Sequence, residues 1–81
     1  MDENDIELAL KAIITEISSI PAEEIKLDTK FEEDLNFDDL DTDAFVIEVK
    51  DKFSIDFTDK EISKATTFGR FFNLVKDKVD E

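Results

Sequence analysis

Carboxylates are the main side chains in this sequence that are able to take part in chemistry, with 23 Asp and Glu against 10 Lys and Arg. The chain has no Cys, which excludes disulfides, thiolate zinc sites and thiol nucleophiles. It also has no His, so the usual near-neutral general base and the commonest metal ligand are both missing. The remaining carboxylates, Lys and hydroxyls form no pattern of base and nucleophile. We therefore expect that this protein is not an enzyme.

The densest carboxylate pattern resembles the opening of a calcium-binding EF-hand loop, because Asp39, Asp41 and Asp43 alternate along the chain. Two positions depart from that loop. Ala44 occupies the sixth position, where Gly allows the sharp turn, and Lys50 stands where a bidentate Glu is needed. We predict no specific metal site here, and weak divalent binding to the carboxylates stays open.

The formal net charge of −13 limits the kind of partner. It opposes binding to nucleic-acid phosphates and to anionic membranes, whereas a basic protein surface would relieve the repulsion. No apolar run approaches the ~20 residues of a membrane span, and the acidic start from Met1 to Asp5 is unlike a signal peptide. We expect a cytoplasmic monomer that binds a basic protein.

The 81 residues predict one all-α domain over 1–81. A first helix is expected between Asn4 and Ser19, with a capping box formed by Asn4 and Glu7. Its apolar residues repeat with helical spacing. They are Ile6, Leu10, Ile13, Ile14 and Ile17.

Three further helices are expected in the second half of the chain. The segment between Leu40 and Phe53 reads as a helix, since too few neighbouring segments alternate with period two to supply a sheet. Thr58 and Glu61 form a second capping box, which opens a short helix that ends near Ser63. The Thr66-Thr67 pair offers caps for a last helix, whose apolar residues are Phe68, Phe71, Phe72, Val75 and Val79.

A long irregular stretch connects the first helix to the second. Pro21 is able to start a short turn through Ile25. A structureless connection of this length is unusual in so small a domain, so we expect it to pack across the helices. Leu27, Phe31 and Leu35 are the predicted anchors of this loop.

The start of the second predicted helix resembles the acyl carrier protein family. Residues 34–42 read D-L-N-F-D-D-L-D-T, against the family signature D-L-G-x-D-S-L-D. The resemblance extends from Phe31 through Phe53 to Lys64-Ala65-Thr66-Thr67 and so covers nearly the whole chain. It implies a four-helix bundle, with three longer helices and one short one, that serves fatty-acid or related lipid or polyketide biosynthesis.

Asp39 departs from that family at the residue that matters most. It stands where the family has the serine that accepts 4′-phosphopantetheine from coenzyme A. Attack by a carboxylate would leave an acyl phosphate, which water hydrolyses readily, and its charge would repel the incoming phosphates. Thr42 lies about one turn further on and is not expected to replace the serine. We predict that Asp39 stays unmodified and that this chain carries no cofactor.

Three interpretations of Asp39 stay open at this point. It is an ordinary residue at a helix N-terminus, where a carboxylate caps exposed N–H groups. Alternatively, it supplies a permanent negative charge near the place of the family's phosphodiester, so that partners dock without the arm. The third possibility is an engineered replacement of the serine in a working carrier.

Two other departures concern backbone and core. Asn36 replaces the signature's Gly, and Asn is the next best residue for a left-handed conformation. Large rings at Phe57, Phe68, Phe71 and Phe72 predict an interior that is filled, with no cavity for an acyl chain.

The resemblance also implies that the second helix is the docking surface for basic patches on acyl-chain-processing enzymes. Such complexes are weak and salt-sensitive, because charge complementarity mainly speeds encounter and selects partners. A solvated acidic face and a regulatory or structural subunit that borrowed this fold are the alternatives. The candidate contact residues are Asp38, Asp41, Asp43, Val46, Ile47, Glu48 and Asp51.

Overall fold

The computed structural model describes residues 2–79, and its helices follow the predicted order. The three longer helices and the single short α-helix confirm the predicted all-α bundle. Between the first two α-helices lies one 3₁₀ turn, η1, at the place predicted for the turn after Pro21. The elements are α1 Glu3–Ser18, η1 Ala22–Glu24, α2 Asp39–Phe53, α3 Asp59–Lys64 and α4 Phe68–Val79.

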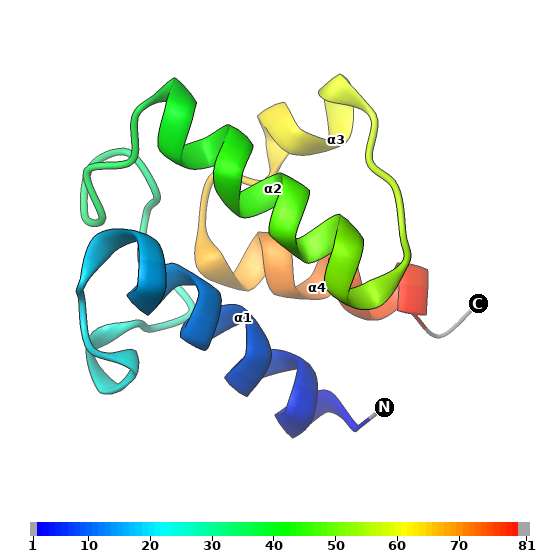
Figure 1. The fold of residues 1–81 in the computed structure, drawn as a ribbon, viewed down its shortest axis with the longest axis horizontal. Helices are drawn as coiled ribbons and strands as arrows, with labels where there is room; N and C mark the ends of the chain where they lie inside the picture. The colour runs from blue at the N-terminus through cyan, green and yellow to red at the C-terminus, as the bar shows by residue number, and fades with distance from the viewer. Residues whose placement is uncertain (1, 80–81) are drawn as a thin grey trace.

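The long helices pack around one shared interior. α1 packs against both α2 and α4, and the short α3 packs against α4 (Figure 1). Both ends of the described chain lie on the same side of the molecule (Figure 1), where Lys76 Nζ is 3.0 Å from Glu3 Oε1. Within residues 2–79 the β-type pairing is limited to one isolated bridge, between Lys30 and Thr67.

The helix starts agree with the predicted caps in two cases out of three. In α3, the Thr58 hydroxyl accepts from the Glu61 amide at 3.1 Å, and the capping box is complete. In α4, the Thr67 hydroxyl accepts from the Arg70 amide at 3.2 Å.

The box predicted at the start of the first helix is wrong. α1 begins at Glu3, so Asn4 already lies inside the helix, and the N-cap residue Asp2 makes no side-chain cap hydrogen bond. The Glu7 side chain instead pairs with Lys11 one turn further along, at 2.9 Å. The Glu7 carboxylate, which the prediction had assigned to the helix cap, therefore forms an ion pair along the helix instead.

The capping box of α3 predicts a pH effect on stability. A hydrogen bond from the Thr58 backbone, followed by the ion pair with Lys78 at 3.0 Å, lowers the pKa of Glu61 from its ordinary value of 4.5. Because the folded pKa lies below the unfolded one, this stabilisation is present above about pH 4.5 and is lost as the pH falls through the folded pKa. Gln keeps the box but not the charge. Urea unfolding should therefore show that Glu61→Gln lowers the free energy of unfolding more at pH 7 than at pH 3.5. A loss of stability that is the same at both pH values would contradict this prediction.

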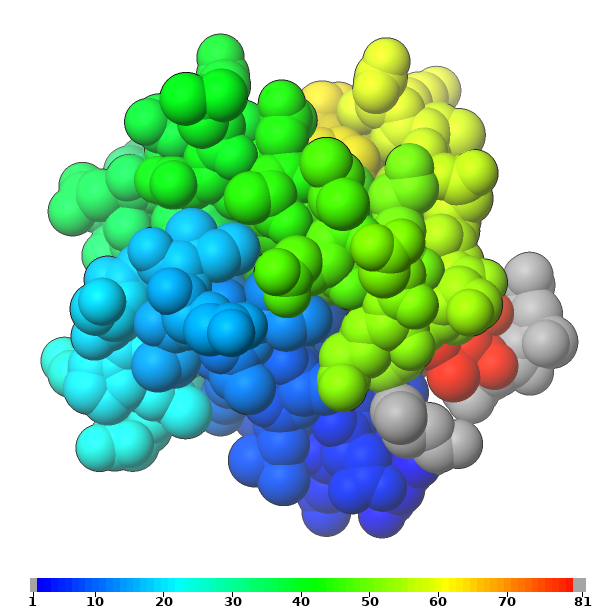
Figure 2. Space-filling view, viewed as in Figure 1, coloured from blue at the N-terminus to red at the C-terminus, as the bar shows by residue number. Residues whose placement is uncertain are grey.

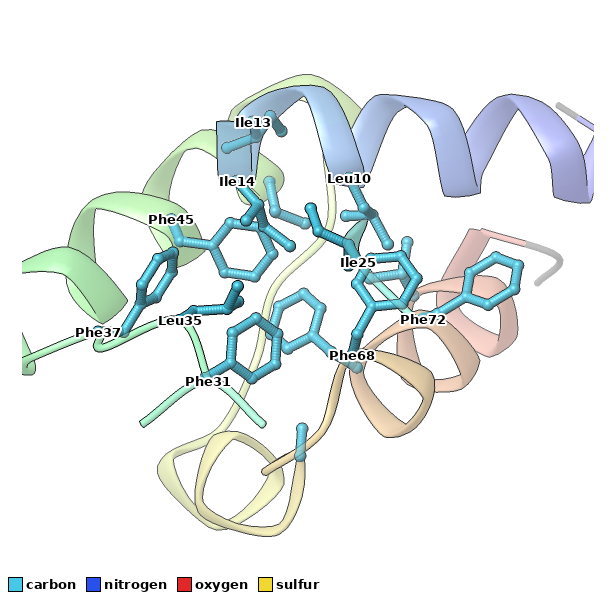
Figure 3. Close-up of a cluster of buried hydrophobic side chains, with 14 of the residues drawn as sticks. Leu10, Ile13, Ile14, Ile25, Phe31, Leu35, Phe37, Phe45, Phe68 and Phe72 are labelled. Carbon is cyan, nitrogen blue, oxygen red and sulfur yellow. The ribbon is translucent and has the colours of Figure 1, made fainter. Parts of the chain in front are cut away.

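Phenylalanine rings form the centre of the core. The Phe45 ring is central, with ring centroids 5.4 Å from Phe31 and 4.8 Å from Phe71. Figure 3 shows the rings of Phe31 and Phe45 beneath α1, with Leu10 and Ile14 pointing down toward the core. Of the apolar residues predicted for the first helix, four are buried and Ile17 packs partly against the core. The buried side chains of α1 are Ile6, Leu10, Ile13 and Ile14.

The loop between α1 and α2 is held by its backbone as well as by side chains. Phe31 and Leu35 are buried, which confirms two of the predicted anchors. Leu27 is wrong as a side-chain anchor, since 60% of its surface is exposed. Its carbonyl oxygen instead accepts from the Gly69 amide at 2.8 Å, and the Thr29 carbonyl accepts from the Phe68 amide at the same distance. These carbonyls satisfy first-turn amides of α4, which have no partner inside the helix.

Gly69 is required by this contact. A Cβ at this position would lie 2.8 Å from the Leu27 carbonyl oxygen and 3.3 Å from the Leu27 Cβ. Overpacking of this kind costs about 1–3 kcal/mol, and the gain in helix propensity on changing Gly to Ala offsets at most about 1 kcal/mol. Gly69→Ala should therefore lower the free energy of unfolding in urea by about 1–2 kcal/mol.

The control for this prediction lies on the same helix. Asn73 is exposed, so Asn73→Ala changes helix propensity without a contact to the loop and should leave stability within about 0.5 kcal/mol. If Gly69→Ala is as stable as Asn73→Ala, the loop at Leu27 shifts to accommodate the added Cβ at no measurable cost, and the prediction is wrong.

Candidate functional site

The start of α2 is built by a capping box that the sequence prediction missed. Asp38 is the N-cap residue, and its carboxylate accepts from the Asp41 amide at 2.8 Å. The Asp41 carboxylate in turn accepts from the Asp38 amide at 3.5 Å. The cap therefore belongs to Asp38 and not to Asp39, which is the first helical residue. Two acids three residues apart were the signal available in the sequence.

Asn36 has the left-handed conformation that its position predicted, with φ of 58°. This turn places the next residue, Phe37, in the core, with its ring centroid 5.7 Å from that of Phe31. The Phe37 amide also donates to the Phe31 carbonyl at 2.9 Å. The turn and the capping box together hold Asp39 at the exposed head of α2.

Next to Asp39 lies a pocket of about 550 Å³. The prediction of a filled interior is therefore only partly right. Phe68, Phe71 and Phe72 are buried, and the half-buried Phe57 ring lies 5.3 Å from that of Phe71. The rings leave space on the side between α2 and α3, where Phe45, Val46 and Ile62 are among the lining residues.

The carboxylates that suggested a calcium loop lie on a helix. Asp39, Asp41 and Asp43 all belong to α2, so their side chains spread around the helix and do not converge as in a loop. Lys50 pairs with Asp56 at 3.1 Å, and this contact lowers the pKa of Asp56. No group of three or more carboxylates in residues 2–79 is arranged to hold a metal ion.

The predicted contact residues of α2 do not share one face. Ile47 is 57% exposed and points outward, with Asp43 and Asp51 exposed on either side of it. Val46 is partly buried and lines the pocket, which makes it a poor choice as a first contact for a partner. Glu48, although exposed, lines a separate groove between α1 and α2.

The outward face of α2 also contains two residues that the prediction did not assign to docking. Leu40 is 78% exposed and Ala44 is exposed, and both share a face with Ile47. The spacing of four and three residues was visible in the sequence, but it gave no sign that this stripe faces solvent. We call Leu40, Ala44 and Ile47 the outer stripe. Figure 2 shows α2 (green) lying on the surface along its length, above α1 (blue).

Fold and site together define a carrier-type domain: a four-helix bundle whose second helix is acidic, is capped at its N-terminus and presents one exposed residue beside an apolar pocket. Residues 9–75 match the family model described as "Phosphopantetheine attachment site". The chain belongs to the acyl carrier protein family.

Similar proteins support this membership over most of the chain. The acyl carrier protein of Helicobacter hepaticus is 41% identical over 59 residues, which cover 73% of this chain and 78% of that protein. That of Beutenbergia cavernae is 33% identical over 67 residues, covering 83% and 82% respectively. A solved structure of the acyl carrier protein from Enterococcus faecalis has the same fold, with a TM-score of 0.84 at 23% identity and coverage of 96% of this chain and 99% of that one.

The family sets the general function. Its members are carriers and not enzymes, and they interact with acyl-chain-processing enzymes, in agreement with the prediction from the sequence. Within residues 2–79, no helix has both the length and the apolar character needed to cross a bilayer.

The prediction from the sequence places the family's attachment position at Asp39, where the side chain is a carboxylate and not an alcohol. The family needs an alcohol there, and Asp39 offers a carboxylate at the exposed N-terminus of α2. Among nearby hydroxyls, Thr42 lies on the next turn, is only partly exposed and lines the pocket. Asp39 itself has no hydroxyl oxygen from which a phosphodiester could form.

Proposed function

We propose that this protein is a member of the acyl carrier protein family that docks onto basic surfaces of acyl-chain-processing enzymes without carrying 4′-phosphopantetheine. The observation that carries the proposal is the carboxylate of Asp39 at the exposed head of α2, in a fold that otherwise matches the family. Incubation with coenzyme A and a phosphopantetheinyl transferase, followed by intact-mass measurement, tests the absence of the arm.

The chemistry of a carboxylate supports the missing arm. Attack on coenzyme A by Asp39 would form a mixed anhydride between a carboxyl and a phosphoryl group, and water cleaves that bond readily. The carboxylate also repels the diphosphate of coenzyme A, whereas a neutral hydroxyl does not. A partner enzyme therefore meets a permanent negative charge at this position.

Docking through α2 is supported by the composition of its outward face. The outer stripe is apolar and exposed, and Asp43 and Asp51 lie beside it. An apolar centre with a charged rim is the usual anatomy of a protein interface. The net charge of −13 favours a basic partner and opposes association with a second copy of this chain.

Docking is testable without knowing the natural partner, because a phosphopantetheinyl transferase recognises carrier domains. The wild-type protein should inhibit transfer of the arm to an intact carrier protein. Ile47→Ser should weaken this inhibition about tenfold, since losing an apolar contact of this size costs about 1.5 kcal/mol.

Leu8 provides the matched control for the docking test. It is an exposed apolar residue, 64% exposed, on α1 and outside the outer stripe. Leu8→Ser should inhibit as well as the wild type. Equal loss in both variants would show that docking does not involve the outward face of α2.

The alternative function is that of a dedicated regulatory or structural subunit that binds one basic partner stably. The fixed charge of Asp39 favours it, since such a subunit would have no use for an alcohol at this position. We further propose that residues 1–81 act as one monomeric domain in the cytoplasm, in keeping with the strong self-repulsion and the absence of Cys.

A further inference from the structure

A second hollow lies between α1 and α2, and its lining includes neither Asp39 nor the outer stripe. It is a groove of about 430 Å³. Its α1 side is apolar, since Leu8 is 64% exposed, Ala12 is exposed, and Ile13 is buried. Leu8 and Ala12 are one turn apart on α1 and lie outside the core. α1 therefore presents a second apolar face, beside the one that packs into the core.

Three exposed charges border this groove. Glu16 lies on α1, whereas Glu48 and Lys52 lie on α2. Glu48 and Lys52 have the four-residue spacing that favours an ion pair along a helix. The ion pairs found among residues 2–79 nevertheless include none of these three side chains. Each of them is therefore available to pair with a charge on a partner.

The charges are divided between the two ends of the groove. α1 and α2 run in opposite directions (Figure 1), so Glu16, near the end of α1, lies toward the start of α2. By the same argument Lys52, near the end of α2, lies toward Leu8. Glu48 stands one turn nearer the start of α2 than Lys52 does. The groove therefore has a negative end, formed by Glu16 and Glu48, and a positive end at Lys52.

We propose that this groove binds an amphipathic helix of a partner protein, which lies along α1 and α2 as a third packed helix. An apolar stripe of that helix, with side chains the size of leucine, covers Leu8 and Ala12. Its C-terminal turn contains Arg or Lys, which pairs with Glu16 and Glu48, and its N-terminal turn contains an acid that pairs with Lys52. This order of charges also suits the dipole of the partner helix itself.

A helix fits this groove better than an extended segment does. Two adjacent helices present ridges and grooves into which the side chains of a third helix pack. An extended segment binds mainly through its backbone, and it needs unpaired N–H and C=O groups as partners. α1 and α2 form their backbone hydrogen bonds internally and offer such groups only at their ends. The walls of the groove therefore select side-chain contacts, which a helix supplies.

This inference goes beyond the docking proposed through the outer stripe, because it concerns other residues and a second partner. Ile47 faces outward on α2, whereas Glu48 and Lys52 line the groove toward α1. Leu8, the control residue of the transferase test, belongs to the groove. Leu8→Ser should therefore keep the inhibition of the transferase and lose the partner helix, and Ile47→Ser should show the reverse pattern. The two proposals are thus able to fail separately.

A synthetic helix serves as the probe. It is a stapled peptide of about 20 residues, long enough for a stable helix, with one leucine stripe, Glu in its first turn and Arg in its last. In ¹H–¹⁵N NMR titrations of the whole protein, it should saturably shift the amides of residues 8–16 and 48–52. The control is a peptide of the same composition and with the same staple, in which Glu and Arg are exchanged. It should bind about fivefold more weakly, because attractive surface charge pairs become repulsive.

Three variants of the protein locate the binding. Leu8→Ser removes an apolar contact and should weaken binding of the peptide about tenfold. Glu48→Gln removes a charge at the rim and should weaken it about two- to fivefold. Asp43→Asn makes the same change in net charge on the same helix, does not line the groove, and should leave the affinity unchanged. All three positions are exposed, so the variants should fold.

Several results would overturn the inference. They are equal binding of the two peptides, amide shifts confined to the outer stripe, unchanged binding by Leu8→Ser, and equal effects of Glu48→Gln and Asp43→Asn. None of them affects the docking proposal, which is read from inhibition of a transferase and from Ile47→Ser. Loss of docking with intact binding of the peptide would instead remove the docking proposal and leave the groove as a helix-binding site.

Discussion

Asp39→Ser should gain one 4′-phosphopantetheine group when it is incubated with coenzyme A and a phosphopantetheinyl transferase, whereas the wild-type protein should gain none. The change supplies an alcohol whose attack on the phosphorus of coenzyme A leaves a stable phosphodiester. The surrounding structure is already in place. Asp38 and Asp41 close the capping box, and Asn36 has the left-handed turn that precedes it. Intact-mass spectrometry reads the outcome directly.

Asp39→Asn is the control for this experiment, because it removes the charge without adding a nucleophilic alcohol. It should stay unmodified. An arm on the wild-type protein would end the proposal that Asp39 blocks attachment. If Asp39→Ser also fails to gain the arm, the surface has diverged from what a transferase recognises, and the dedicated interaction subunit becomes the better description.

Phe45→Ala should cause the largest loss of stability among the changes considered. Phe45 is only 1% exposed, and its ring contacts those of Phe31, Phe37 and Phe71. Replacing a buried Phe by Ala costs about 3–5 kcal/mol, through lost burial and the cavity that remains. Domains of this kind are stable by about 5–15 kcal/mol, so most of the margin should disappear. Urea unfolding followed by circular dichroism measures the loss.

Two variants on the same helix calibrate this loss. Phe45→Leu keeps most of the apolar volume and should cost clearly less than Phe45→Ala. Ile47→Ala changes an exposed side chain two residues away and should stay within about 0.5 kcal/mol. A Phe45→Ala protein that loses less than 1 kcal/mol would mean that the rings around the pocket move together and close the cavity.

Local patterns were sufficient to predict most of the elements. The apolar repeats and the Thr58 and Thr67 caps placed helices that the structure confirms, because caps and helical stripes depend on residues three or four apart. The same reasoning failed at Asn4 and Glu7. The Glu7 carboxylate was able to form either a cap with Asn4 or an ion pair with Lys11, and in the structure it pairs with Lys11.

The candidate site was predicted less completely than the helices. Residue type and spacing predict that Asp39 stands at the family's attachment position, where its side chain is a carboxylate and not an alcohol. The sequence did not show whether each side chain of this helix points to solvent or to the pocket. Leu40 and Val46 both read as apolar residues of one helix, yet Leu40 faces solvent and Val46 lines the pocket. Only the positions of α1, α3 and α4 around α2 decide between these two environments.

The sequence by itself determined the family and the order of the helices, because both depend on residue type and short spacing. It also predicts that Asp39 lacks the alcohol needed for attachment. Only the tertiary structure decided that Leu27 holds the loop by its carbonyl, that an apolar pocket opens beside Asp39, and that the outer stripe is free. These features arise where segments distant in sequence meet, and the space left between packed side chains is a property of the whole fold.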